Sequence, residues 1–312
     1  LMQYAKRTPH WINLTGSFTT NGLVNAWGQS FAMDFGSALG YSFSAFKERW
    51  FRPRFGTRAE QEVLEPLPWA MEEITKRIAP FSLSIDPKDY MDIRAVNVVD
   101  VPVELPPVAL KQYHTLRDKA VLELSSEKAI TAVNAGAKAM KLLAVACGHV
   151  YDENGQPHHV HDAKLDALQG LVEELNGAPL LVCYQFTADK AAILRRFPEA
   201  TDLPVGARQK QVEDDWNAGK IKMLVVHPAS CGHGLSLQHG GCDVAFYGTG
   251  WNAELYEQVI ERIGPMRQMQ SGYDRVVTVY RLLASGTLDS FAAEKVAGRI
   301  VSGEEVMEAL KR

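Results

Sequence analysis

In the second half of this 312-residue chain, short apolar runs alternate with helix-forming stretches. This alternation restricts the possible folds more than any other feature of the sequence. The runs at residues 179–184, 221–226, 243–247 and 275–282 are of strand type, and helices are predicted at 188–196, 210–218 and 253–263. Strands that alternate with helices predict an α/β fold with a parallel sheet covered on both faces. Ligands of such sheets bind where the strands end, which here means residues 184–187, 227–234 and 248–252.

The loop that follows the strand at 222–226 has the character of a phosphate- or nucleic-acid-binding loop. It contains Gly232 and Gly234, which allow close backbone approach and can present amide donors to a phosphate. The helix after the next strand carries Leu255, Val259 and Ile263 as an expected apolar stripe. Gln258 and Arg262 share another face of that helix, one turn apart.

Gly264 and Pro265 separate Arg262 from Arg267, the second arginine of this region. Proline predicts that the helix ends near Ile263.

Composition excludes few classes of protein. The net charge of −4 means that any contact with nucleic acid must come from local basic patches. The four cysteines include no Cys-x-x-Cys pair, and no targeting or membrane segment is evident, so we expect a reducing cytoplasm.

The first 127 residues are less regular. We expect a strand at 11–14, a helix at 21–34, an irregular stretch after Gly40, helices at 70–78 and 107–124, and a strand at 95–103. Residues 47–58 interleave cations with Trp50, Phe51 and Phe55, a pattern that predicts either a DNA contact through Arg52 and Arg54 or an aromatic-anchored surface loop. Further helices are predicted at 128–147 and 164–175.

Five segments, in order, resemble motifs of the Swi/Snf-related branch of superfamily-two helicases, particularly phage and bacterial members. Residues 13–17 with 21–23 and Trp27 are similar to motif III, 180–186 to motif IV, 229–237 to motif V and 257–270 to motif VI, while 287–289 resemble the closing signature. The spacing of Arg262 and Arg267 departs from the usual Arg-x-x-Arg, and serines at 82 and 84 stand where the family often has arginines.

The resemblance implies a RecA-like second helicase lobe. Residues 1–44 would be the end of a first lobe, 45–127 a linker and helical protrusion, and 128–312 the second lobe. Gln258, Arg262 and Arg267 would be catalytic, with either arginine as the principal finger. Gly232, Gly234 and the same arginines would bind ATP, whereas the implied DNA contacts are Tyr184, Gln185, Phe186, His227, Ser230, Arg52 and Arg54.

No Gly-x-x-x-x-Gly-Lys-[Ser/Thr] loop and no Asp-Glu-x-x motif occurs in the chain. We therefore expect ATP with Mg²⁺ whose metal ligands lie on a missing N-terminal lobe, and an isolated chain that is inactive as an ATPase. The expected partner is double-stranded DNA, in a bacterial cell or phage-infected host.

Two alternatives stay open. The chain could be a non-catalytic nucleic-acid-binding or protein-docking module that uses the same surface. It could also be a metal-dependent nucleic-acid enzyme, but neither His158, His159 and His161 nor the group of Cys231, His233, His239 and Cys242 has the paired spacing of a zinc site. We therefore expect no metal site.

Overall fold

The structure is a computed structural model that describes residues 7–8, 10–14, 23–53, 64–85, 91–126, 132–231 and 234–296. The chain divides into two compact units, Leu1–Tyr90 (unit 1) and Met91–Arg312 (unit 2), and each is described by itself. No described helix is long and apolar enough to cross a bilayer.

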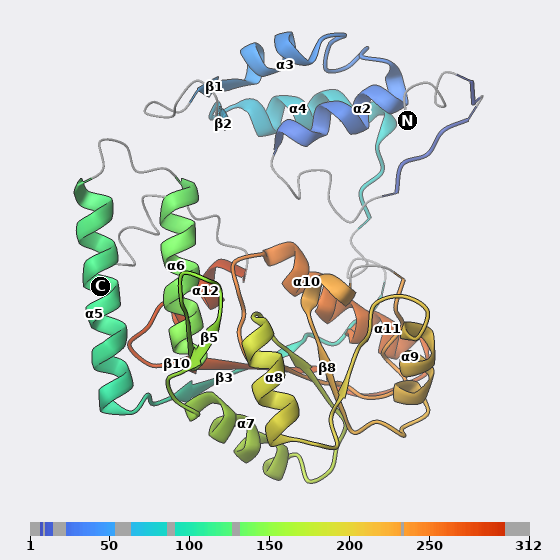
Figure 1. The fold of residues 1–312 in the computed structure, drawn as a ribbon. Coiled ribbons are helices and arrows are strands. Elements are labelled where there is room, and N and C mark those ends of the chain that lie inside the picture. The colour runs from blue at the N-terminus through green and yellow to red at the C-terminus, as the bar shows by residue number, and fades with distance from the viewer. Residues whose placement is uncertain are drawn as a thin grey trace. The chain divides into compact units, whose positions relative to one another are not determined.

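Unit 1 is a small helical body with one short hairpin (Figure 1). Its elements are η1 (Leu23–Asn25), α2 (Ala26–Asp34), α3 (Phe43–Trp50), β1 (Phe51–Pro53), β2 (Leu64–Pro66), α4 (Ala70–Ile78) and η2 (Ala79–Phe81), with β1 and β2 antiparallel. The core combines Phe46, Trp50 and Phe51 with Ile74 and Ile78 of α4.

Two predictions in this unit are wrong. Residues 11–14 form no strand, and Ile12 and Leu14 are exposed, because a strand needs a paired neighbour and no described residue of the unit supplies one. The stretch predicted to be irregular contains α3 instead. Ser42 caps its first turn by accepting a hydrogen bond from the Ala45 amide, and Phe46 and Trp50, one turn apart, bury its inner face.

Unit 2 is built on a six-stranded parallel sheet in the order β3-β10-β9-β6-β8-β7. The strands are β3 (Asn97–Val103), β6 (Leu180–Cys183), β7 (Thr201–Asp202), β8 (Met223–Val226), β9 (Asp243–Phe246) and β10 (Thr278–Ala284). This confirms the predicted α/β class. The strand expected at 95–103 is an edge strand of this sheet, paired with β10 along seven residues from Thr278↔Asn97 to Ala284↔Val103.

Helices cover both faces of the sheet because its buried strand residues alternate between two cores. Val226, Val244 and Phe246 face α9 (Gln209–Asn217) and α10 (Ala253–Ile263). Val225 and Ala245 face the other core, with residues of α7 (Ala163–Glu174) and α8 (Thr187–Arg196). Figure 1 shows these two helices beside the sheet.

The remaining elements of unit 2 are α5 (Pro107–Ser126), α6 (Ala132–Ala146), β4 (His149–Tyr151), β5 (Pro157–His159), η4 (Pro228–Cys231), α11 (Pro265–Gln270) and α12 (Asp289–Val296). The helices α5 and α6 pair and bury Tyr113, Leu142 and Leu288 in a third core. Residues 149–159 form the β4–β5 hairpin, whose turn Asp152 closes by accepting from the amides of Asn154 and Gln156.

Most predicted helices and strands of unit 2 are confirmed to within a few residues, although residues 127–131, where one predicted helix would begin, lie outside the described part. The apolar stripe of α10 needs one correction. Tyr256, Val259 and Ile263 are buried, whereas Leu255 is half-buried. Tyr256 takes this place because its ring packs on Phe246 of β9, with centroids 4.5 Å apart.

Candidate nucleotide and nucleic-acid site

The predicted strand-end residues converge at the carboxyl edge of the sheet. Tyr184 follows β6 and His227 follows β8, and their rings meet edge to face with centroids 5.4 Å apart. Burial lowers the pKa of His227, and its Nδ1 accepts a hydrogen bond from the Ala229 amide. Tyr184 is itself only 8 % exposed, so its phenol chiefly supports the imidazole.

Gln185 and Phe186 form the turn between β6 and α8. The carboxylate of buried Asp189 accepts from both of their amides, at 3.3 and 2.9 Å, which fixes the turn. The Gln185 side chain lies against Gly248 and Gly250, where an added Cβ would overlap or closely contact it. The loop after β9 therefore packs directly on the loop after β6.

Ser230 is a half-buried residue of η4. Its amide donates to the His227 carbonyl at 2.8 Å, and its carbonyl accepts from Gln209 Nε2 of α9 at 3.2 Å. These bonds fix the backbone of Ser230, and its half-buried side chain stays partly accessible.

Arg262 and Arg267 both hold the loop that follows β8. Arg262 Nε donates to the Cys231 carbonyl at 2.9 Å, and Arg267 Nη1 donates to the Leu235 carbonyl at 3.3 Å and to Ser236 Oγ at 3.0 Å. The Arg262 carbonyl in turn accepts from the Leu237 amide. The motif V and motif VI segments are thus joined by hydrogen bonds.

The break between the two arginines is as predicted. Helix α10 ends at Ile263, and Gly264 precedes Pro265 at the first position of α11. Burial lowers the pKa of Arg267, and the positive charge of Arg262 lowers it further, which shows that the two guanidinium groups repel each other electrostatically. An anion beside such a pair would be stabilised.

Gln258 lies one turn before Arg262 on α10, as predicted. Its Nε2 donates to Glu254 Oε1 at 3.0 Å along the same helix. Gly234 adopts a φ of +75° with open space around its Cα, whereas Gly232 and His233 lie outside the described residues.

Gln268 anchors α11 and was not singled out in the sequence. It is 1 % exposed, and its Nε2 donates to the carbonyls of Gln238, Gly241 and Ile263 at 2.8–3.1 Å. An amide directly after Arg267 was the only available signal, and a sequence pattern cannot tell such an anchor from a surface glutamine.

A buried ionic cluster also escaped prediction. Lys164 Nζ lies 2.5 Å from Asp289 Oδ2 and donates to the Tyr247 carbonyl at 2.9 Å, with both charged side chains almost fully buried. Burial lowers the pKa of Lys164, but the Asp289 carboxylate offsets this and the net shift is upward. Asp289 also accepts from the Ala284 amide, so the closing signature ties α12 to the end of β10.

The aromatic and basic segment at 47–58 is divided by the structure. Trp50 and Phe51 are buried in the core of unit 1, so neither can stack on a base. Arg52 is exposed and faces Glu65 across the β1–β2 hairpin at 3.5 Å, while Arg54 and Phe55 lie outside the described residues.

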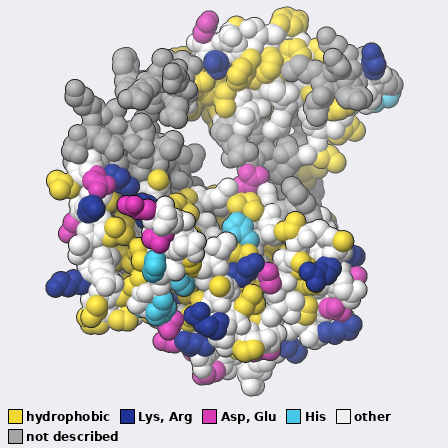
Figure 2. All heavy atoms as spheres, viewed as in Figure 1, with side chains coloured by type: hydrophobic (Ala, Val, Ile, Leu, Met, Phe, Trp, Pro, Cys, Tyr) yellow, Lys and Arg dark blue, Asp and Glu magenta, His cyan; other side chains and the backbone are white. Residues whose placement is uncertain are grey.

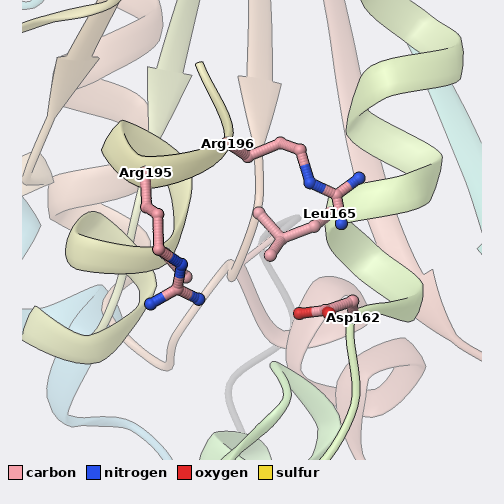
Figure 3. Close-up of a pocket in the computed structure, with 5 residues that line it drawn as sticks. Asp162, Leu165, Arg195 and Arg196 are labelled. Carbon is pink, nitrogen blue, oxygen red and sulfur yellow. The ribbon is translucent and has the colours of Figure 1, made fainter. Parts of the chain in front are cut away.

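Charged side chains of both signs are interspersed over the face of unit 2 shown in Figure 2. A pocket of about 210 Å³ lies between α7 and α8, lined by Asp162, Leu165, Ala192, Arg195 and Arg196 (Figure 3). None of the predicted site residues lines it.

The described residues contain no group of three His, Cys, Asp or Glu side chains that could hold a metal ion. His158 and His159 pair instead with Asp152 and Asp162, and His161 is buried with its Nε2 against the Val145 carbonyl. Burial raises the pKa of Cys231 to about 12, so its thiol stays protonated.

Solved structures share this fold. The C-terminal part of the Fun30 ATPase domain matches 70 % of this chain and 97 % of its own length, with a TM-score of 0.54 and 13 % identity. The Sulfolobus solfataricus SWI2/SNF2 ATPase core in complex with dsDNA matches 95 % of this chain and 65 % of its own, with a TM-score of 0.52 and 18 % identity. The C-terminal domain of that ATPase matches 69 % and 94 %, with a TM-score of 0.50 and 16 % identity.

Unit 2 therefore shares the RecA-like α/β fold of the C-terminal lobes of SWI2/SNF2 ATPases. No protein-family model matches the sequence. The chain belongs to the family of protein p41 from Acyrthosiphon pisum secondary endosymbiont phage 1, to which it is 40 % identical over 314 residues. That match covers the whole chain and 67 % of p41, so the chain spans about two thirds of its relative's length.

Proposed function

We propose that this chain is the C-terminal part of an ATP-dependent DNA helicase or translocase. The observation that carries the proposal is the seating of Arg262 and Arg267 on the loop after β8, within a fold like that of SWI2/SNF2 C-terminal lobes. The sequence resemblance adds the order of the motifs, with motif V and motif VI as the two segments that these hydrogen bonds join.

In this proposal the two arginines act on the phosphates of ATP. The Arg267 guanidinium is half-buried beside Arg262, and its Nη1 donates to two neutral oxygens, the Leu235 carbonyl and Ser236 Oγ. Glu261 and Glu213 partly offset the repulsion from Arg262, and a phosphate would offset it further. ATP would supply the phosphoryl group whose hydrolysis drives the motor. The arginines would stabilise charge that develops on the phosphate oxygens, and Gln258 would hold its place beside them through Glu254.

The phosphate-loop and magnesium ligands would come from a first RecA-like lobe outside this sequence. Residues 1–44 would then end that lobe, 45–127 would form a linker and helical protrusion, and 128–312 the second lobe. Strand β3 is the part of the middle segment that joins the sheet of unit 2.

The carboxyl edge of the sheet would be the DNA track, in the cytoplasm of a bacterial cell or phage-infected host. One neighbour of similar fold was solved in complex with dsDNA, which favours duplex DNA as the partner. His227, Gln185, Phe186 and Ser230 would provide contacts, Tyr184 would support His227, and Gly232 and Gly234 would allow close backbone approach.

The test is DNA-stimulated ATP hydrolysis by the full-length natural protein that contains this sequence. Arg262→Ala and Arg267→Ala are compared with wild type at matched DNA occupancy, measured by fluorescence anisotropy. We expect loss of an arginine finger to lower kcat by about 10³-fold or more while DNA binding is retained. The arginine with the larger loss is the principal finger.

Arg195→Ala is the matched control, because it also removes one guanidinium from unit 2 but lies in the pocket between α7 and α8. Its kcat should equal that of wild type. Unchanged turnover in both arginine variants would reject the finger assignment. DNA binding without ATP hydrolysis in the wild-type protein would favour the non-catalytic module instead.

A further inference from the structure

Three side chains form a stack outside the hydrophobic core of unit 2. The Arg275 guanidinium lies 3.8 Å from the centre of the Tyr273 ring. His239 meets that ring edge to face at 5.7 Å, and its Nδ1 lies 3.1 Å from the Tyr273 hydroxyl. Tyr273 and Arg275 are half-buried and His239 is exposed, so the stack is open to solvent.

The stack is held in place before any ligand arrives. The Tyr273 amide donates to the Gln268 carbonyl at 2.9 Å, immediately after α11. Gln238 Nε2 lies 3.2 Å from both His239 Nε2 and Ser271 Oγ, which joins the imidazole to the same turn. A rigid aromatic surface loses little conformational entropy when a flat ligand stacks on it.

The stack is also close to the proposed phosphate-binding arginines. Helix α11 begins two residues before Arg267, and the Ser271 amide at its other end donates to the Arg267 carbonyl at 3.0 Å. Arg267 and Tyr273 are therefore six positions apart, with five residues of helix and turn between them, a reach of at most about 10 Å. That distance suits the two ends of one nucleoside triphosphate.

We propose that Tyr273 and Arg275 bind the base of the nucleotide by stacking, with His239 fixing the phenol ring. The inference rests on the proposed function and adds a base-binding site to it. A nucleobase is a flat π-system, and both aromatic rings and guanidinium planes stack on it with little dependence on its identity. The phosphates of the same nucleotide would face Arg267 at the start of α11.

The test compares ATP with inorganic tripolyphosphate, which carries the same kind of charge but has no base. KM for ATP and the competitive inhibition constant of tripolyphosphate are measured for the full-length natural protein and for Tyr273→Ala, Tyr273→Phe and Arg275→Ala. Removal of a stacking ring should raise KM by about tenfold or more. The inhibition constant of tripolyphosphate should not change, and Tyr273→Phe, which keeps the ring, should stay close to wild type.

Arg195→Ala controls for the loss of one positive charge, and the melting temperature of every variant controls for folding. A lower melting temperature in Tyr273→Ala with an unchanged KM would show that the stack of His239, Tyr273 and Arg275 has a purely structural role, and it would overturn the inference. So would an equal rise of KM and of the tripolyphosphate constant, or a loss of single-stranded DNA affinity with KM unchanged. A wild-type protein without ATP hydrolysis would instead reject the proposed function and the inference with it.

Discussion

Replacing Lys164 by methionine should destabilise unit 2 strongly, because it leaves a carboxylate buried without its counter-charge. In the native protein Lys164 Nζ contacts Asp289 Oδ2 at 2.5 Å and the Tyr247 carbonyl at 2.9 Å, and both charged side chains are almost fully buried. Methionine retains the apolar stem of lysine and removes only its charge and donors.

The expected size follows from these contacts. Breaking a buried ion pair from one side costs about 3–5 kcal/mol of unfolding free energy. In the double variant Lys164→Met/Asp289→Asn the buried charge is gone, and the asparagine can still accept from the Ala284 amide. The Tyr247 carbonyl loses the Lys164 ammonium and keeps only the weak Cys147 thiol donor at 3.9 Å, so the double variant should lose only about 1–3 kcal/mol.

The assay is hydrogen exchange of peptides from β9 and β10, which gives the free energy of opening of unit 2 independently of unit 1. Arg196→Met is the control, since Arg196 pairs with Asp166 at the surface and should be worth less than about 1 kcal/mol. A loss of unfolding free energy below about 1 kcal/mol for Lys164→Met would refute this account of the cluster. So would a loss in the double variant equal to the sum of the losses in Lys164→Met and Asp289→Asn.

Two further predictions concern buried polar side chains. Gln268→Met should lower the stability of unit 2 by roughly 2–3 kcal/mol in the same exchange assay, because three carbonyls lose their donor. The control Gln270→Met, at an exposed position, should change it by less than about 0.5 kcal/mol. Equal effects of the two variants would contradict the anchoring role of Gln268. His161 donates from Nε2 to the Val145 carbonyl and accepts at Nδ1 from the Ala163 amide, and burial lowers its pKa below 6.5. Because the folded state disfavours protonation of His161, the free energy of unfolding should fall as the pH drops below 6.5. Urea unfolding between pH 7 and 5 should show a smaller fall in His161→Gln than in wild type. Parallel pH profiles of the two proteins would exclude His161 as the source of the pH dependence.

Local patterns in the sequence predicted the sheet well. The strands β6, β8 and β9 are almost continuously buried apolar runs, and α7 and α10 carry apolar stripes. Both patterns are set by neighbouring residues, so the alternation of strand-type runs with helices was enough to predict a parallel sheet covered on both faces. The break at Gly264 and Pro265 followed from backbone chemistry alone.

The candidate site was predictable only in part. The order of the motifs pointed to Arg262 and Arg267 as candidates. Their hydrogen-bond partners, the carbonyls of Cys231 and Leu235, could not be predicted, because they depend on how the loop after β8 packs against α10. The strand predicted at residues 11–14 failed for the complementary reason, since a local pattern cannot supply the neighbouring strand that pairing requires.

The sequence by itself determined the α/β class, most of the helices and strands of unit 2 and the residues that end its central strands, because these depend on chemistry within a few positions of one another. Only the tertiary structure decided that Lys164 meets Asp289, that Gln268 caps three carbonyls, and that Arg275 stacks on Tyr273 beside His239. A lysine or glutamine has the same local pattern whether it is solvated or buried. The partners that distinguish the two cases lie on other elements, and packing brings them together.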